Sequence, residues 1–489
     1  MNKDFSNCSS YGKLMLLVSI LIATPIIVIP FYPEEIKYIN AFLFPSIITF
    51  IIGTVICLCT NREKNDNPEA YTMKSGSTTV LFIWLYGFFL GALPFVISRQ
   101  LNFVQALFES VSGWTTTGLS VMDVTITPHI FLFHRGFMQF CGGLGFILVM
   151  VMFIQGKQAM SLYSAEGHPD KLTPNLGKTA RIIFLMYITF LVVGVTLYIL
   201  FGMEPFDSLL HTMSALSTGG FSTKVDSIGY YHSIAIEAIT IILMLIGTTN
   251  FAVLLLVAKR KILRLIKVSE IRFMLVLIIL AVPIIACSLF FGLYLNMGQS
   301  LRLSVFNVVS ALSTTGYSTM SYSDWPVFSI GILILLMLIG GGIGSTAGGM
   351  KMSRVYLMLR VTKENIKKRI LSSRYVSNPY YYRAQGKTYI DKGIEMDTFG
   401  FISCYLMIFI IGTLLITLTE GCSLSDAMFE FASSLGTVGL SIGLTGPSTN
   451  SGTLIIEIIG MIFGRLEIFI VIIGIYSGFT KVKQRFIKR

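Results

Sequence analysis

The stretch TTTGLS at Thr115–Ser120 decides the fold, because the chain carries three further variants of it at intervals of roughly one hundred residues. The other copies are STGGFS at Ser217–Ser222, STTGYS at Ser313–Ser318 and GTVGLS at Gly436–Ser441. Four copies that align at several columns are hard to obtain by drift. The sequence therefore predicts an internal fourfold repeat.

The residues before each copy repeat as well. Six residues before the glycine there is always a serine, nine before a polar residue, and ten before a large apolar residue. The serines are Ser112, Ser214, Ser310 and Ser433, and the polar residues are Glu109, His211, Asn307 and Glu430. We expect a short apolar helix ahead of each loop. A helix of about 12 residues is too short to span a bilayer, so it must be re-entrant.

Four Thr/Gly loops that follow short helices suit a ring of main-chain carbonyls around a cation. Glycine lets the chain turn its carbonyls inward without a side chain on the axis. The segment Thr437-Val438-Gly439 repeats the opening of the Thr-Val-Gly-Tyr-Gly potassium filter, and no Asp or Glu lies in the four loops. We therefore predict a K⁺ selectivity filter. Its residues are Thr116, Thr117, Gly118, Thr218, Gly219, Gly220, Thr314, Thr315, Gly316, Thr437, Val438 and Gly439. Small residues used only for helix packing would explain one such loop, but not four in register.

The composition places the chain in a membrane. It is 54% hydrophobic and 13% charged, whereas soluble domains carry about 25% charged residues. Ten apolar runs are long enough to be candidate spans. They are residues 14–31, 39–59, 78–98, 130–154, 181–202, 232–258, 272–295, 327–360, 397–419 and 453–479.

The predicted fold is an all-α polytopic membrane protein. Four helix–pore helix–filter loop–helix repeats surround one central pore, and two extra transmembrane helices precede them. The expected boundaries are 1–71 for the extra helices, then 72–174, 175–269, 270–394 and 395–489 for the repeats. One chain with four units closes a ring by itself.

The net charge of +12 is distributed unevenly. Only a few basic residues fall in segments expected outside, namely Lys37, Arg99, Lys224 and Arg302. This asymmetry predicts cytoplasmic amino and carboxyl termini. The basic clusters Lys259–Lys267, Lys351–Lys392 and Lys481–Arg489 are explained by the same rule, with a docking surface for a cytoplasmic partner as the alternative.

A second motif, GGGIGSTAGG at Gly340–Gly349, interrupts the apolar run Val327–Arg360. So many glycines predict a break at membrane depth, and a flexible loop there could block or open the pore. A packed kink is the alternative. A phosphate-binding loop is excluded because Met350 intervenes before Lys351 and no strand precedes the motif. The predicted gate residues are Gly340, Gly341, Gly342, Gly344, Ser345, Thr346, Gly348, Gly349, Lys351 and Arg465.

Arg465 falls near the centre of the last apolar run. An intramembrane arginine costs at least ~2.5–3.5 kcal/mol on insertion scales, which makes it a functional candidate. We expect it in the cavity beneath the filter, where its charge opposes a resting cation; an interhelical partner is the alternative. Arg135, near the outer end of its run, is expected to snorkel and to be structural.

Enzyme chemistry is poorly supported. The five histidines and seven cysteines show no metal-ligand spacing, and no catalytic set can be argued from spacing. We expect no cofactor other than the transported K⁺. Coupled potassium–proton or potassium–sodium symport stays open because Glu457 and Glu467 lie in the last apolar run.

Taken together, these motifs resemble the Trk/Ktr/HKT superfamily of potassium uptake proteins, specifically its bacterial TrkH-type membrane subunits. The resemblance rests on FESVSGWTTTGLS, SALSTGGFST, SALSTTGYST, GGGIGSTAGGMK and FGRLEIF, and it covers essentially the whole chain. It implies one central glycine per filter loop, a gating loop at Gly340–Gly349 and a cavity arginine at Arg465. Gly118 favours potassium, because serine there accompanies sodium transport in the plant branch.

The resemblance also implies partners. Family members form homodimers in the bacterial cytoplasmic membrane and dock on a ring of TrkA-type nucleotide-binding regulatory subunits. The ligand that controls the gate would then bind the partner rather than this chain. The fourth loop, GTVGLS, looks more like the KtrB type than the Gly-Pro-containing fourth loop of some TrkH proteins.

Overall fold

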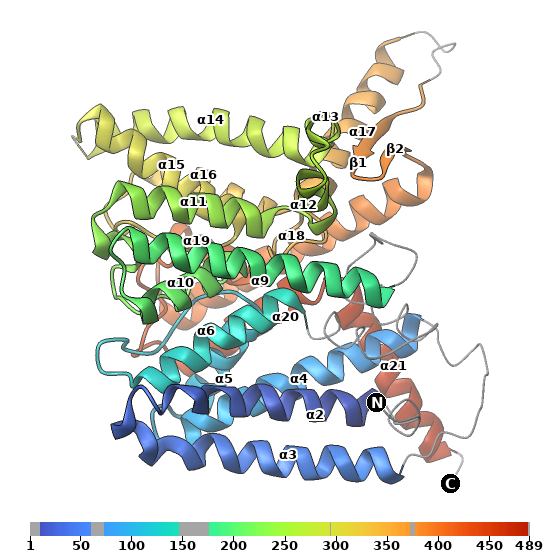
Figure 1. Ribbon diagram of the computed structural model, residues 1–489. Helices are drawn as coiled ribbons and strands as arrows, with labels where there is room; N and C mark the ends of the chain where they lie inside the picture. Colours follow the sequence, from blue (N-terminus) through green and yellow to red (C-terminus); the bar gives the residue numbers. More distant parts are fainter. Residues whose placement is uncertain (1–9, 60–72, 146–175, 294, 372–376, 488–489) are drawn as a thin grey trace.

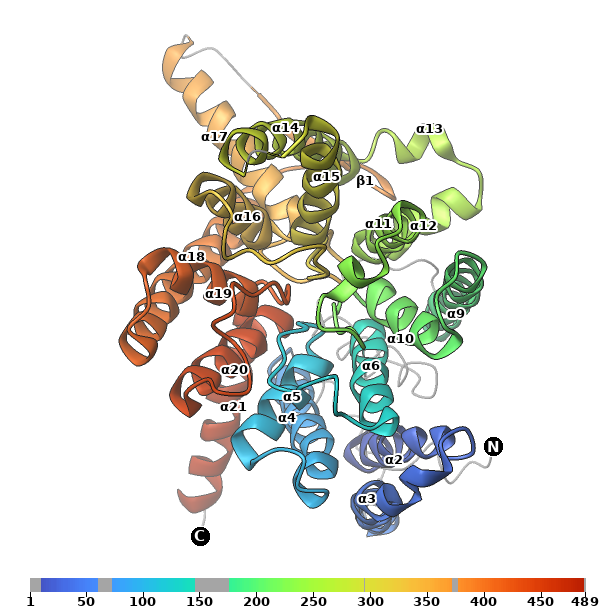
Figure 2. The same ribbon diagram turned by 90° about the vertical axis from the view of Figure 1, so that its left-hand side faces the viewer.

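The computed structural model describes residues 10–59, 73–145, 176–293, 295–371 and 377–487. These residues form helices joined by loops, together with one two-stranded hairpin (Figure 1). The view in Figure 2 shows four groups of helices around a common centre, with the loops of each group converging there.

The amino-terminal segment forms a helical hairpin at the edge of this ring (Figure 2). It consists of α2 (Ser10–Ala23), η1 (Thr24–Val28), η2 (Pro33–Tyr38) and α3 (Ile39–Cys59). A proline stands in the first turn of both short 3-10 helices, where the missing N–H is not needed. The two extra helices predicted ahead of the repeats are therefore present.

Each of the four units begins with a long helix and continues with a short one. The long helices are α4 (Met73–Ile97), α9 (Leu176–Leu200), α14 (Ser269–Gly292) and α18 (Lys392–Glu420). The short helices are α5 (Phe103–Trp114), α10 (Pro205–Leu216), α15 (Met297–Ser313) and α19 (Leu424–Leu435). Three of the short helices have 12 residues, or about 18 Å at 1.5 Å per residue. They cannot cross the bilayer, as the sequence predicted.

Local sequence explains where the short helices start. Asn102 caps α5 in a capping box with Gln105, and Ser423 caps α19 through the backbone N–H of Asp426. The apolar column of the repeat then faces the core, because Phe108, Phe306 and Phe429 have no exposed surface.

The second main helix of every unit stops part-way. These helices are α6 (His129–Leu144), α11 (Ile234–Thr248), α16 (Val327–Ile339) and α20 (Ser451–Arg465). After α11 and α20 the chain turns by 114° and 103° into α12 (Phe251–Ala258) and α21 (Ile468–Ile487). After α16 it forms the glycine-rich loop and then α17 (Met352–Ile370), so the predicted break is confirmed.

The expectation of ten simple spans is therefore wrong in detail. Among the described residues, six helices are long and apolar enough to cross a membrane, or up to eight if each bent pair counts as one span. The runs 232–258 and 453–479 are bent pairs, and the end of the run 130–154 lies outside the described residues. Hydropathy does not reveal such bends; at the bend after α11, for example, the backbone bonds the distant glycine-rich loop, with Phe251 N–H donating to Gly344 O and Gly342 N–H donating to Thr248 O.

The remaining elements belong to the connecting segments of units 2 and 3. They are η4 (Ser227–Tyr231), α13 (Ile262–Leu265), β1 (Tyr380–Arg383) and β2 (Gly386–Tyr389). The two strands pair antiparallel, with Tyr380 opposite Tyr389. The hairpin lies beside α17 (Figure 1), and the backbone N–H of Tyr382 donates to Ser269 Oγ at the start of α14, at 3.0 Å.

Candidate functional site

The four repeated loops share one backbone conformation. The threonine two residues before each glycine is left-handed, with φ of 57°, 53°, 55° and 50° at Thr116, Thr218, Thr314 and Thr437. This conformation is costly for a β-branched residue, so its fourfold recurrence shows that the surroundings impose it. We call the four segments Thr115–Ser120, Ser217–Ser222, Ser313–Ser318 and Gly436–Ser441 the ring loops.

The ring loops interlock around a closed cycle. The glycines after the left-handed threonines have φ of 94°, 74°, 81° and 96°. A side chain at any of them would overlap the main-chain carbonyl of the next unit. The pairs are Gly118 with Gly219 O, Gly220 with Thr315 O, Gly316 with Val438 O, and Gly439 with Thr117 O. Each loop touches the following one, and the fourth touches the first.

Exposure is graded along each ring loop. The four left-handed threonines are fully buried, whereas Gly118, Gly220, Gly316 and Gly439 are partly exposed. The serine two residues after each glycine is partly exposed as well. The partly exposed residues of each ring loop therefore come after the left-handed threonine, which is itself shielded from solvent.

The repeated serines support the ring loops. Ser112 Oγ donates to Leu119 O at 2.6 Å and accepts from the N–H of Gly118 at 3.0 Å. Ser310 donates to Tyr317 O at 2.6 Å, and Ser433 accepts from the N–H of Gly439 at 3.0 Å. In these three units the serine bonds its own loop.

The polar column holds the segment that follows each ring loop. Glu109 accepts from Ser120 Oγ at 3.0 Å and from the N–H of Val121 at 3.1 Å. Glu430 accepts from Ser441 Oγ at 2.6 Å. The other two members do the same with uncharged groups: His211 Nε2 lies 2.9 Å from Ser222 Oγ, and Asn307 Nδ2 donates to Thr319 Oγ1 at 3.2 Å.

The side chain of Arg135 does not reach toward the membrane surface as the sequence predicted. Its side chain is 3% exposed and forms an ion pair with Glu109, with 3.2 Å between Nη1 and Oε1. The guanidinium also lies 4.2 Å from the ring centroid of Phe221. It therefore does not snorkel, because a buried carboxylate of the repeat supplies its counter-charge.

The glycine-rich loop lies against the buried side of the ring. The N–H of Gly348 donates to Thr314 Oγ1 at 2.8 Å, and Thr346 Oγ1 lies 3.1 Å from Thr218 Oγ1. A side chain at Gly348 would overlap Thr437 Oγ1. The loop thus contacts three of the four left-handed threonines. These threonines have no exposed surface, so the loop packs against the solvent-shielded part of the ring.

Arg465 joins this loop to two units. Its Nη1 donates to Thr346 O at 2.6 Å, and its Nη2 donates to Gly142 O at 2.5 Å. The residue is the last of α20, at the 103° bend, and not in the middle of a straight helix as expected. Lys351 Nζ donates to Ala347 O within the same loop. Both predicted gate cations therefore bond carbonyls of the glycine-rich loop.

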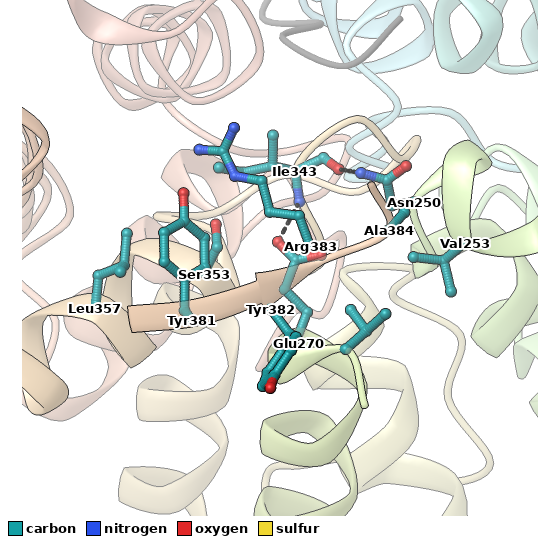
Figure 3. A pocket seen from close by; sticks show the side chains of 11 residues that line it. Asn250, Val253, Glu270, Ile343, Ser353, Leu357, Tyr381, Tyr382, Arg383 and Ala384 are labelled. Carbon is teal, nitrogen blue, oxygen red and sulfur yellow. Dashed lines mark hydrogen bonds between the residues drawn. The ribbon is translucent and has the colours of Figure 1, made fainter. Parts of the chain in front are cut away.

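The other end of the glycine-rich loop is bonded by one side chain of unit 2 and one of unit 3. Asn250 Nδ2 donates to Ile343 O at 2.5 Å, and the N–H of Ile343 donates to Glu270 Oε1 at 3.3 Å (Figure 3). Figure 3 shows Tyr381 and Arg383 of β1 lining the same pocket. Asn250 also caps α12 through the N–H of Ala252, which stabilises the bend after α11.

Three polar residues that support the loops were not predicted from the sequence. Gln139, Asn250 and Glu270 all bond main-chain groups of a ring loop or of the glycine-rich loop. The available signal was an isolated polar side chain in or beside an apolar run, since such groups need a partner in a membrane. No cluster of His, Cys, Asp or Glu suited to a metal ion occurs in the part of the chain that the structure describes.

The fold and this site define an all-α polytopic membrane protein in which four pseudo-fourfold repeats surround one central pore. The TrkH family, described as cation transport proteins, matches residues 39–476. The chain belongs to this family.

Individual relatives agree over nearly the whole length. The Trk system potassium uptake protein TrkG of Escherichia coli is 32% identical over 96% of this chain and 96% of its own. TrkH of the same organism is 30% identical over 89% and 91%. The crystal structure of the potassium transporter TrkH from Vibrio parahaemolyticus superposes with a TM-score of 0.83, at 27% identity, over 96% of this chain and 98% of the other. These relatives are named as transporters and not as enzymes.

Proposed function

We propose that this chain is the membrane subunit of a potassium uptake system. K⁺ passes through the ring loops on main-chain carbonyls, and the glycine-rich loop with Arg465 and Lys351 forms the gate. The relatives support the cation, since those compared above are named as potassium uptake proteins or a potassium transporter. The filter residues are those predicted from the repeat.

The closed cycle of ring loops carries this proposal. Four glycines with positive φ, each against a carbonyl of the next unit, set main-chain oxygens around one axis at a fixed spacing. Carbonyl rings of this kind replace the hydration shell of a cation. Their dipoles stabilise the ion without a carboxylate, which fits the absence of Asp and Glu from the ring loops.

Two contacts support the proposed gate. The glycine-rich loop bonds the left-handed threonines through Gly348 and Thr346, so an ion that leaves the ring meets the loop. Arg465 holds the loop through Thr346 O. Two unit charges 4 Å apart interact by about 4 kcal/mol at an effective dielectric of 20, so the guanidinium also opposes a cation that rests beneath the ring.

Control of the gate is assigned to a partner. The name Trk system denotes several components, and a cytoplasmic regulatory subunit of the nucleotide-binding TrkA type is the partner we propose, with a homodimer of this chain in the bacterial cytoplasmic membrane. The pocket of Figure 3 supports a route for control, because Glu270 accepts from the N–H of Ile343 and residues of the β1–β2 hairpin line the same pocket. A partner that shifts the hairpin would then act on the gate.

The proposal is tested by ⁸⁶Rb⁺ uptake into proteoliposomes that contain the full chain, with and without a TrkA-type partner. K⁺ should compete strongly, Na⁺ weakly and choline not at all. Competition by Na⁺ equal to that by K⁺ would contradict a potassium filter. Uptake that requires an imposed proton or sodium gradient would instead establish the coupled symport that Glu457 and Glu467 left open.

A further inference from the structure

The second ring loop is built differently from the other three. In units 1, 3 and 4 the residue before the glycine has a side chain, namely Thr117, Thr315 or Val438, whereas unit 2 has Gly219. Thr117 Oγ1 lies 2.8 Å from Thr115 Oγ1, and Thr315 Oγ1 lies 2.8 Å from Ser313 Oγ. Gly219 can form no such side-chain pair with Ser217, so its loop lacks a support that the first and third loops have, and it also lacks the side chain that Val438 provides in the fourth.

A side chain from another unit fills the vacant position. A β-carbon built on Gly219 would overlap Cδ, Oε1 and Nε2 of Gln139. Gln139 belongs to α6 of unit 1 and has no exposed surface. Its amide therefore occupies the volume that a threonine or valine occupies in the other loops.

The same amide takes over the polar contacts of the loop. Gln139 Nε2 donates to Gly219 O at 2.5 Å, while Oε1 accepts from the N–H of Phe221 at 3.2 Å and from Ser214 Oγ. The orientation of the amide follows from its partners, because a carbonyl requires the NH₂ group and an N–H requires the oxygen. Ser214 consequently differs from Ser112, Ser310 and Ser433, whose hydroxyls bond their own ring loops.

We propose that Gln139 is a positioning residue that sets the carbonyl of Gly219 in the ring and thereby contributes to the choice between K⁺ and Na⁺. This inference rests on the filter proposed above. Gly219 O is the oxygen that closes the ring against Gly118, so its place fixes the spacing between the first and second loops. Without the amide, this carbonyl and the N–H of Phe221 lose buried partners, and a looser ring can close on the smaller Na⁺.

The geometry also predicts compensation. Gly219→Thr alone should collide with the amide of Gln139 and impair the ring. In a Gln139→Ala background the same substitution has room, and the new hydroxyl can pair with Ser217 as Thr117 pairs with Thr115. Each change should therefore be harmful alone and tolerated together, which a merely structural role of Gln139 does not require.

The experiment measures K⁺/Na⁺ discrimination in ⁸⁶Rb⁺ uptake by full-length chain in proteoliposomes. The variants are Gln139→Ala, the similarly sized Gln139→Met, Gly219→Thr, and Gln139→Ala with Gly219→Thr. Gln299→Ala, at an exposed glutamine of α15, is the matched control. We expect about a fivefold loss of discrimination in both Gln139 variants, the size of one net hydrogen bond, and recovery of most of it in the double variant.

Two results would overturn the inference: parent-like discrimination in both Gln139 variants, or Gly219→Thr being as harmful with Gln139→Ala as without it. Selective uptake by the parent separates this outcome from failure of the proposed function. If the parent takes up no ⁸⁶Rb⁺ even with the TrkA-type partner present, the proposed function fails. Apparent melting temperatures of the single and double variants then still test whether Gly219→Thr compensates for Gln139→Ala. A double variant more stable than the sum of the two single losses supports compensation, and additive losses refute it.

Discussion

The position that a side chain would take at Gly439 is filled by the carbonyl oxygen of Thr117, and this contact joins the fourth ring loop to the first. The two residues are far apart in sequence, yet they complete a cycle whose other three contacts have the same form. A single chain thereby builds a closed ring. Its glycines are required for two reasons, the positive φ and the neighbouring oxygen.

Replacing Gly118 by serine tests this requirement. The new side chain would overlap Gly219 O, and the backbone is held at φ 94°. Left-handed strain alone costs about 1–2 kcal/mol, so we expect roughly a tenfold loss of K⁺/Na⁺ discrimination in ⁸⁶Rb⁺ competition. Gly443→Ser is the matched control, because Gly443 has φ 99° but no heavy atom near the added carbon. Equal effects of the two substitutions would indicate that strain, and not the ring contact, matters.

Removing the Arg465 side chain should open the pore. Arg465→Ala loses the bonds to Thr346 O and Gly142 O and removes a positive charge below the ring. We expect uptake without the partner to rise at least about tenfold, the effect of about 1.4 kcal/mol on a barrier. Arg465→Lys, which keeps the charge but cannot bond both carbonyls, should give an intermediate rise. Arg264→Ala, on an exposed arginine of α13, controls for the loss of a positive charge away from the ring. A closed pore in the folded Arg465→Ala variant would place the gate elsewhere.

The buried pair of Glu109 and Arg135 should be needed for folding. Arg135→Met leaves the Glu109 carboxylate buried without its counter-charge, and breaking a buried pair typically costs about 3–5 kcal/mol. The apparent melting temperature in detergent should fall markedly. Adding Glu109→Gln should restore part of the loss, because a neutral amide still accepts from Ser120. If the double variant were less stable than Arg135→Met, the pair would not be the cause.

The amino-terminal hairpin should stabilise α6 through one carboxylate. Glu35 accepts from the N–H groups of His129 and Ile130, both at 2.7 Å, at the start of this helix. Glu35→Gln removes the charge and one good acceptor, for an expected loss of about 0.5–2 kcal/mol. Glu34→Gln, one residue earlier and exposed, should leave the melting temperature unchanged. Because α6 carries Gln139, we also expect weaker K⁺/Na⁺ discrimination in Glu35→Gln. If Glu35→Gln lowers the melting temperature but leaves discrimination unchanged, the Glu35 cap stabilises α6 without affecting the ring loops.

The sequence predicts the repeated parts of this molecule well. Each ring loop is a local pattern, and its serine and polar columns bond within their own unit in most copies, as Ser112 and Glu430 do. A repeated pattern of this kind can be interpreted from sequence because its residues bond one another within the same unit. The break at Gly340–Gly349 was predictable for the same reason, since the glycines themselves disfavour a helix.

Contacts between units could not be predicted in this way. Gln139 stands in unit 1 but bonds unit 2, and Arg465 stands in unit 4 but bonds the end of α6 and the loop of unit 3. The bends after Thr248 and Arg465 depend on such partners as well. Neither the pairing of Arg135 nor these bends follows from hydropathy, which averages over neighbours in sequence and not in space.

A substitution changes fewer loops in a ring built by one chain than in a ring built by four identical chains. In a homotetramer every substitution is present four times, so a departure such as Gly219 would have to be accepted at each corner together with its compensation. Here a change alters a single corner, and its remedy can arise at an unrelated position, as the glutamine of α6 illustrates. In the proposed filter, ion preference can therefore change one loop at a time, and a single chain can reach asymmetric coordination spheres that a symmetric assembly cannot.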